Sequence, residues 1–257
     1  MKWTHSSTIF SLVCVMLLGG CRTQKEETKI VRVATAANMQ FAMEQLTTAF
    51  TKNTGISCEV VVSSSGKLYA QIREGAPYDL FVSADLKYPN ELHKKKLTRS
   101  APKVYAYGQL VLWTMNDTLQ LSLDQLTLNQ IRHIAIANPK TAPYGRAAIE
   151  VLKRHTLVAS VSEKLVYGES IAQTNQFITS GAAEIGFTSK SVVVSNEMKG
   201  KGKWVVINNN DYSPIKQGVV LLNNRKIKNP VAQKFYDFLF TEEGKNILQN
   251  FGYSVYE

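Results

Sequence analysis

The chain has 257 residues, enough for one large domain or for two lobes of about 100 residues each. Apolar residues make up 44% of it and charged residues 19%, which is typical of a folded globular protein and excludes disordered and collagen-like chains. The formal net charge is +10, but Lys and Arg are spread along the chain, so we expect no nucleic-acid partner. Three cysteines are too few for a disulfide scaffold.

The N-terminal segment has the pattern of a secretion signal. Residues 9–18 form an apolar run that two glycines and Cys21 close. Ten residues of helix span only about 15 Å, half of the hydrocarbon layer, so the run predicts a signal peptide and not a membrane span. Small residues before a cysteine resemble a lipobox. We therefore predict a signal peptide over 1–20, a lipid on Cys21 and a tether over 21–28 that anchors the chain to a membrane; plain secretion with cleavage nearby is the alternative.

Strand and helix patterns alternate through the rest of the chain. Short apolar or alternating runs predict strands at 29–34, 59–62, 79–82, 134–137 and 184–188. Apolar residues at helical spacing follow four of these strands, and we expect Asn38 to be the N-cap of the first such helix. Further helices are predicted at 146–154, from Ser170 through Phe177, and as a terminal pair over 229–251 with Pro230 at its first position. This alternation predicts an α/β fold with mostly parallel sheets.

Two apolar stretches, 109–113 and 218–222, interrupt the alternation because neither is followed by a helix. A chain that leaves one lobe and later returns to it needs two such crossovers. We therefore predict one lobe from 29–107 together with 217–257, and a second lobe over 108–216.

No motif of catalysis or metal binding is present. The four histidines lack the spacing of metal ligands, and the chain has no GxSxG, HExxH or CxxC. The Ser65-Gly66-Lys67 stretch lacks both the first glycine and the final Ser or Thr of a phosphate-binding loop. We expect no catalytic residue, no cofactor and no direct metal ligand. Cys58 is expected to be a buried small apolar residue.

Small polar residues lie instead where strands lead into helices. Helix N-termini present unpaired N–H groups and the positive end of the helix dipole, and α/β sheets bind ligands at the carboxyl ends of their strands. Each such residue taken singly is more often a plain helix cap. Together, in a secreted two-lobed chain, they predict a cleft that closes on an anion. The residues are Asn38, Ser64, Ser65, Tyr144, Gly145, Ser170 and Ile171.

At these junctions the chain resembles the molybdate-binding periplasmic proteins, which have the two-lobed type II periplasmic binding fold with a ligand cleft between the lobes. The resemblance covers residues 29–255, and its most specific stretch is GAPYDLFVSAD at 75–85. The other matching stretches are 36–39, 64–68, 70–72, 137–139, 142–145 and 183–187.

The resemblance implies a set of oxyanion-binding residues. Asn38 would donate from its side chain and its backbone, Ser65 from its hydroxyl and amide, and Ala37, Tyr144 and Ile171 from backbone N–H groups. Some relatives add a tyrosine hydroxyl at the position of Ser189, and Tyr144 or Ser170 is a candidate to replace it. The additional candidates are Ser64, Ser170 and Ser189. Lys67 is expected to face solvent, and Asp79 and Asp85 to be structural.

The resemblance also implies the ligand and the partners. Molybdate is a tetrahedral dianion without a proton to donate, so its site needs donors only, and tungstate has the same charge and nearly the same size. The chain would bind molybdate in the periplasm or at the cell surface as a monomer and deliver it to the permease and ATPase subunits of an ABC importer. Two alternatives stay open: a receptor for sulfate or phosphate, and a secreted α/β enzyme.

Overall fold

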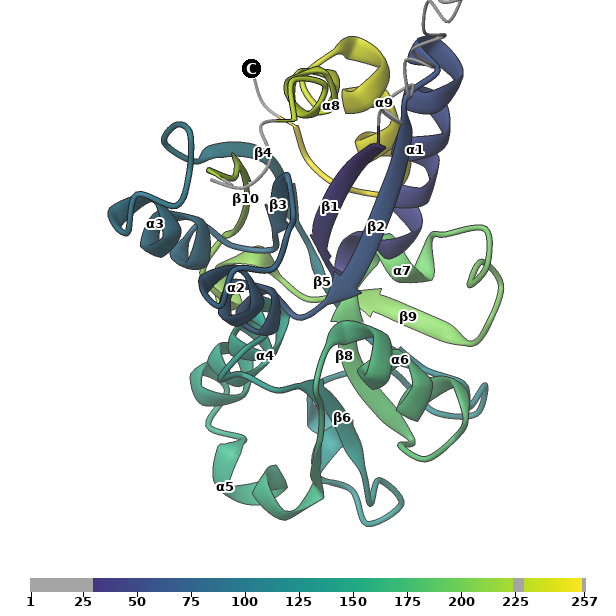
Figure 1. Ribbon diagram of the computed structural model, residues 1–257. Coiled ribbons are helices and arrows are strands. Elements are labelled where there is room, and N and C mark those ends of the chain that lie inside the picture. Colours follow the sequence, from purple (N-terminus) through teal and green to yellow (C-terminus); the bar gives the residue numbers. More distant parts are fainter. Residues whose placement is uncertain (1–29, 224–228, 256–257) are drawn as a thin grey trace, which may run out of the picture.

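The computed structural model describes residues 30–223 and 229–255, and its strands form two five-stranded sheets with helices packed on their faces (Figure 1). The first sheet has the order β2-β1-β3-β10-β4 and the second the order β7-β6-β8-β5-β9. The predicted signal peptide, Cys21 and the tether over 21–28 lie outside the described residues.

The first sheet has helices on both faces. One hydrophobic core packs α1, α8 and α9 against one face, and a smaller core packs α2 and α3 against the other. The strands are β1 (Ile30–Ala36), β2 (Ser57–Ser63), β3 (Leu80–Ser83), β4 (Lys103–Gly108) and β10 (Ile215–Leu221), and the helices are α1 (Gln40–Thr54), α2 (Ser65–Arg73), α3 (Lys87–Lys94), α8 (Ala232–Phe238) and α9 (Glu242–Asn250).

The second sheet carries its own core, to which α4 and α6 contribute. Its strands are β5 (Leu110–Thr114), β6 (Ile134–Ala137), β7 (Leu165–Gly168), β8 (Ile185–Ser189) and β9 (Lys203–Val206). The α-helices are α4 (Pro143–Arg154), α5 (Val158–Val161), α6 (Ile171–Thr179) and α7 (Lys190–Val193). Short 3-10 turns are η1 (Ala37–Met39), η2 (Asp124–Thr127), η3 (Ser162–Lys164) and η4 (Asn209–Asp211).

The predicted α/β class is confirmed, and each sheet is mixed. The central strand β1 runs parallel to β2 and β3, and β6 runs parallel to β7 and β8. The strands that follow the crossovers run antiparallel to their neighbours, β10 in the first sheet and β5 in the second. The chain passes between the sheets twice, from β4 to β5 and from β9 to β10. The lobe boundaries stay a prediction, which this membership of the sheets supports.

Several local predictions were wrong at the ends of elements, and three whole strands were missed. Helix α4 begins at Pro143 and not at residue 146, since proline suits the first position of a helix. Pro230 does not occupy that position in α8, because Val231 is the N-cap there. Asn38 lies inside η1 and caps no helix. Strands β4, β7 and β9 were not predicted, since exposed or half-buried side chains blur their apolar pattern. None of the helices in the described residues is long and apolar enough to span a bilayer.

Candidate functional site

A small cavity lies between the two sheets, at the junctions that the sequence singled out. It leaves about 10 Å³ for the centre of a water molecule, so only a small ligand could occupy it. All five predicted oxyanion-binding residues line it, and so does Ser64, whereas Ser170 and Ser189 are not among the lining residues. The lining residues are Ala36, Ala37, Asn38, Ser64, Ser65, Ala84, Ala142, Pro143, Tyr144 and Ile171.

Four elements begin at this cavity, two from each sheet. They are η1 after β1, α2 after β2, α4 after β6 and α6 after β7. Ser64 caps α2 by accepting from the Lys67 N–H at 3.4 Å, and Ser170 caps α6 by accepting from the Gln173 N–H at 3.4 Å. The first N–H groups of each helix have no partner within the helix, so backbone donors and helix dipoles converge on the cavity.

Ser65 has a hydroxyl that is free to donate into the cavity. The residue is fully buried, and its Oγ accepts a hydrogen bond from the Ala84 N–H at 3.0 Å. That bond uses a lone pair of the oxygen and leaves the hydroxyl proton for a ligand.

The side chain of Asn38 is engaged elsewhere. Its Nδ2 donates to Gln217 Oε1 at 2.9 Å and to Tyr253 Oη at 2.8 Å. An amide nitrogen has two hydrogens, so these bonds use both, and the expectation that this side chain donates to a ligand does not fit the geometry. The backbone N–H of Asn38 is the donor that this residue can offer.

The Tyr144 hydroxyl lies in a buried cluster between the sheets. It accepts from Gln217 Nε2 at 3.1 Å and from Ser189 Oγ at 3.3 Å. Burial raises the pKa of this hydroxyl well above its ordinary value, so it stays protonated. Ser189 also bonds to Ser191 in the same cluster. Tyr144 therefore lines the cavity while its hydroxyl is held by this cluster, and Ser189 is not among the lining residues.

The lining of the cavity carries no charged side chain. Lys67 follows Ser65 and Gly66 in α2 and is a candidate counter-ion, but its side chain is exposed to solvent and pairs with Glu169. Asp79 accepts from the Arg32 N–H and the Asn229 side chain, which is a structural role. The part of the chain that the structure describes holds no group of three or more His, Cys, Asp or Glu side chains that could bind a metal ion. An anion in this cavity would meet neutral donors and no carboxylate to repel it.

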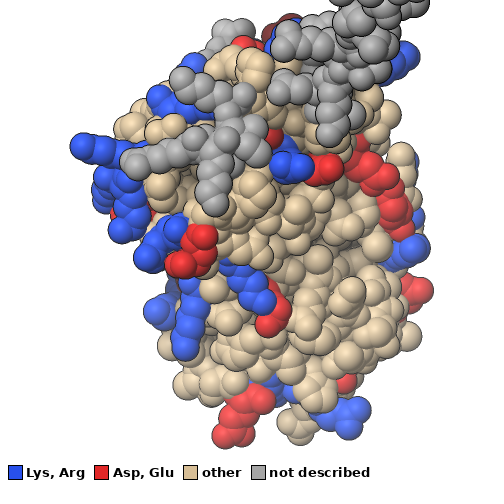
Figure 2. All heavy atoms as spheres, in the orientation of Figure 1, with Lys and Arg blue, Asp and Glu red and all other residues tan. Residues whose placement is uncertain are grey.

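Positive charge lies instead on the outer surface, over α3. Lysine and arginine side chains gather at the left of the view, where α3 lies (Figure 2). The contributing residues around α3 include Lys87, Lys94, Lys95 and Lys96. Such a surface raises the local concentration of anions, and salt screens the effect.

Direct hydrogen bonds join elements of the two sheets beside the cavity. The Gly66 N–H at the start of α2 donates to the Thr141 carbonyl at 2.9 Å, and Tyr88 Oη donates to the Lys140 carbonyl at 3.0 Å. A side chain at position 66 would collide with Thr141, so this approach needs glycine. In Figure 1, α2 and α4 face each other at this boundary.

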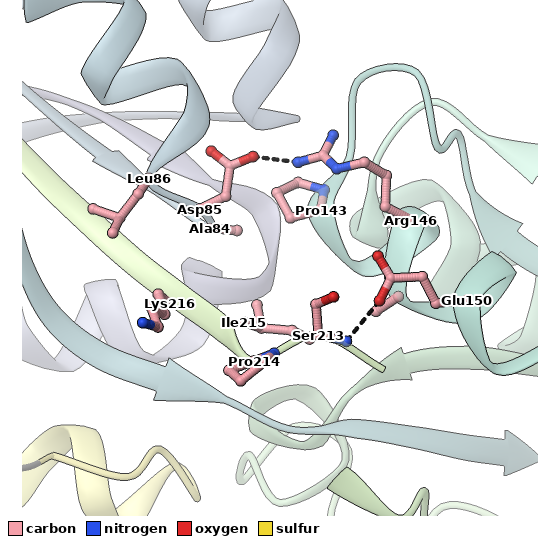
Figure 3. A pocket seen from close by; sticks show the side chains of 11 residues that line it. Ala84, Asp85, Leu86, Pro143, Arg146, Glu150, Ser213, Pro214, Ile215 and Lys216 are labelled. Carbon is pink, nitrogen blue, oxygen red and sulfur yellow. Dashed lines mark hydrogen bonds and ion pairs between the residues drawn. The ribbon is translucent and has the colours of Figure 1, made fainter. Parts of the chain in front are cut away.

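An ion pair closes the rim beside these contacts. Asp85, which follows β3, pairs with Arg146 of α4. Both residues line a cavity of about 210 Å³ (Figure 3). Burial raises the pKa of the Asp85 carboxyl, and the Arg146 guanidinium opposes that shift. Figure 3 also shows Glu150 accepting from the Ser213 N–H, which ties α4 to the segment before β10.

Residues 31–254 match the family of bacterial extracellular solute-binding proteins. The chain belongs to this family. It is 37% identical to the molybdate-binding protein ModA of Azotobacter vinelandii over 99% of this chain and 100% of that protein, and 35% identical to ModA of Rhodobacter capsulatus over 87% of each. The structure of the periplasmic molybdate-binding protein of A. vinelandii superposes with a TM-score of 0.83, at 33% identity, over 88% of this chain and 100% of that one.

These matches rule out the alternative of a secreted α/β enzyme, because the family is one of solute-binding proteins. The sulfate-binding protein SubI of Mycobacterium tuberculosis shares the fold of this solute-binding protein, with a TM-score of 0.75 at 13% identity over 89% of this chain and 88% of that one. The fold therefore does not choose between tetrahedral anions, and the choice depends on the residues of the cavity.

Proposed function

We infer that this solute-binding protein is the molybdate-binding component of an ABC transporter. The observation that carries the inference is the buried, uncharged cavity on which four element N-termini converge, in a chain 37% identical to a molybdate-binding protein over its whole length. Neutral N–H and O–H donors bind a dianion strongly when both are removed from water, because such hydrogen bonds are charge-assisted.

The proposed binding groups are the hydrogen-bond donors of the lining residues that have no other partner among the described residues. We propose the Ser65 hydroxyl and backbone N–H groups at Ala37, Asn38, Tyr144 and Ile171 as donors, with Ser64 as a further candidate. Tungstate is proposed as a second ligand, because its charge equals that of molybdate and its size is nearly the same.

Delivery requires the protein to stay near its membrane partners. We propose that a lipid on Cys21 anchors the mature chain, so that the two lobes, 29–107 with 217–257 and 108–216, work as a monomer at the membrane surface. A related protein of Bacillus subtilis, 24% identical over 98% of both chains, is named a putative ABC transporter substrate-binding lipoprotein.

A thermal melt with added oxyanions tests the ligand. The chain from residue 22 onward contains every described element and is melted alone or with molybdate, tungstate, sulfate or phosphate. An anion at a thousandfold excess over its dissociation constant stabilises the folded state by about 4 kcal/mol, which is several degrees of melting temperature. We expect molybdate and tungstate alone to raise the melting temperature. A rise with sulfate or phosphate instead would refute the molybdate assignment and keep the anion site.

A further inference from the structure

The buried side chain of Gln217 connects cavity residues that belong to the two different sheets, although Gln217 itself does not line the cavity. Gln217 lies in β10, where the chain returns from the second sheet, and is fully buried. Its Oε1 accepts from Asn38 Nδ2 at 2.9 Å and from Tyr105 Oη at 3.0 Å, and its Nε2 donates to Tyr144 Oη at 3.1 Å. One amide thus holds a cavity residue from each sheet, Asn38 after β1 and Tyr144 in α4.

The backbone at both crossovers accommodates this side chain. The pairing of β10 with β4 shifts register between Gln217 and Gly218, a bulge of the kind that redirects a side chain. In the other crossover, a Cβ at Gly108 would overlap the Tyr144 hydroxyl and the Gln217 amide. The two crossover segments therefore leave room for this amide and little else.

A second chain of hydrogen bonds connects the same two cavity residues. Tyr253 Oη and Ser191 Oγ both donate to the Asn38 carbonyl, at 3.0 and 2.7 Å. Ser191 Oγ lies within hydrogen-bonding distance of Ser189 Oγ, and Ser189 Oγ in turn lies 3.3 Å from the Tyr144 hydroxyl. Burial raises the pKa of Tyr253 to about 12, so this hydroxyl stays neutral, like the amides and the other hydroxyls of the network. No member of this network carries a charge that would attract or repel an anion in the cavity.

We propose that Gln217 is a positioning residue for oxyanion binding. It keeps the backbone at Asn38 in register with the backbone at Tyr144, so that the donors of the two sheets converge on one ligand. Opening the cleft would carry Tyr144 away from Asn38 and Gln217, so the bond from Gln217 Nε2 to Tyr144 Oη, which crosses between the sheets, also favours the closed arrangement. The inference rests on the proposed oxyanion site and adds to it a residue that no ligand contact would reveal.

Three variants of the chain from residue 22 onward test the proposal by calorimetric titration with molybdate. Gln217→Met keeps the length of the side chain and removes its three hydrogen bonds. Tyr144→Phe removes only the hydroxyl and leaves the backbone donor in place. The matched control is Thr114→Val: Thr114 is equally buried, and its hydroxyl bonds to the Glu184 carbonyl within the second sheet, apart from the cavity.

We expect Gln217→Met and Tyr144→Phe to weaken molybdate binding by about tenfold to a hundredfold. This is the range found when a residue that orients a metal ligand through a hydrogen bond is removed. The double variant should bind about as weakly as Tyr144→Phe alone, because loss of the Tyr144 hydroxyl already removes its bonds to Gln217 and to Ser189. Thr114→Val should lose stability in denaturant without ligand and yet bind like the unmodified chain.

The outcomes separate this inference from the proposed function. If the unmodified chain does not bind molybdate, both are wrong. If it binds and folded Gln217→Met binds within about twofold of it, the function stands and the positioning role is refuted. Equal losses in Thr114→Val and Gln217→Met would also refute it, because affinity would then follow stability alone. Should Gln217→Met fail to fold, the same comparison with Tyr144→Phe decides.

Discussion

Removing the Ser65 hydroxyl should separate binding from folding more clearly than other changes at the cavity. In the structure this oxygen has two tasks: it accepts from the Ala84 N–H at 3.0 Å, and its proton is free toward the cavity. Ser65→Ala removes both tasks and changes neither the charge nor the course of α2. The first task exists with and without ligand, and the second exists only with it.

The two tasks predict two magnitudes. A hydrogen bond to a charged group contributes about 1.5–3 kcal/mol, so the lost donor should weaken molybdate binding by about tenfold to a hundredfold. The Ala84 N–H loses a partner in a fully buried place, which costs about 1–3 kcal/mol of unfolding free energy whether or not ligand is present. Because this second cost is common to the free and bound protein, it cancels from the dissociation constant.

Titration calorimetry measures the dissociation constant, and urea unfolding without ligand measures the stability. Thr241→Ala is the control: Thr241 caps α9 by accepting from the Gly244 N–H at 3.1 Å, away from the cavity. It should cost about 1 kcal/mol of stability and leave binding unchanged. If Ser65→Ala binds molybdate as tightly as the unmodified chain, the N-terminus of α2 is only a capped helix end and the assigned site is wrong.

Three further predictions follow from single contacts. Asn38→Ala removes one buried donor from Gln217 Oε1 and one from Tyr253 Oη, although both side chains keep other partners, so urea unfolding should show a loss of about 1–3 kcal/mol besides weaker molybdate binding; unchanged stability would mean that the two bonds are not formed. Gly145→Ala places a methyl group against a carbonyl of β6, and we expect about 1–3 kcal/mol of lost stability and a displaced α4 that binds molybdate more weakly, unlike Gly181→Ala, where nothing lies near and only the backbone is strained. Cys58 is half-buried and not fully buried as expected, and this partial burial raises its pKa to about 12, so roughly one thiol in ten thousand is ionised at pH 8 and iodoacetamide should label the native chain far more slowly than the urea-unfolded chain by mass spectrometry; rapid native labelling would contradict the raised pKa.

The sequence by itself determined the fold class and the junctions that meet at the cavity. Apolar periodicity is a local property, so strands such as β6 and helices such as α2 could be read from a few neighbouring residues. In an α/β fold the carboxyl ends of neighbouring parallel strands lie on the same edge, and the residues after them are brought together. For this reason Ser65, Tyr144 and Ile171 line one cavity, although none of them belongs to a sequence motif that by itself predicts an anion site.

Only the tertiary structure decided what each of these side chains does. The partners of the Asn38 amide, Gln217 and Tyr253, lie 179 and 215 residues further along the chain. The antiparallel direction of β10 and the bulge beside Gln217 likewise depend on the crossover between the sheets and not on local periodicity. A buried polar group takes whichever partner packing brings within hydrogen-bonding distance, because leaving it unpaired costs more than any local preference. The sequence could therefore place Asn38 at the cavity, but only the packing of both sheets commits its side-chain amide to Gln217 and Tyr253.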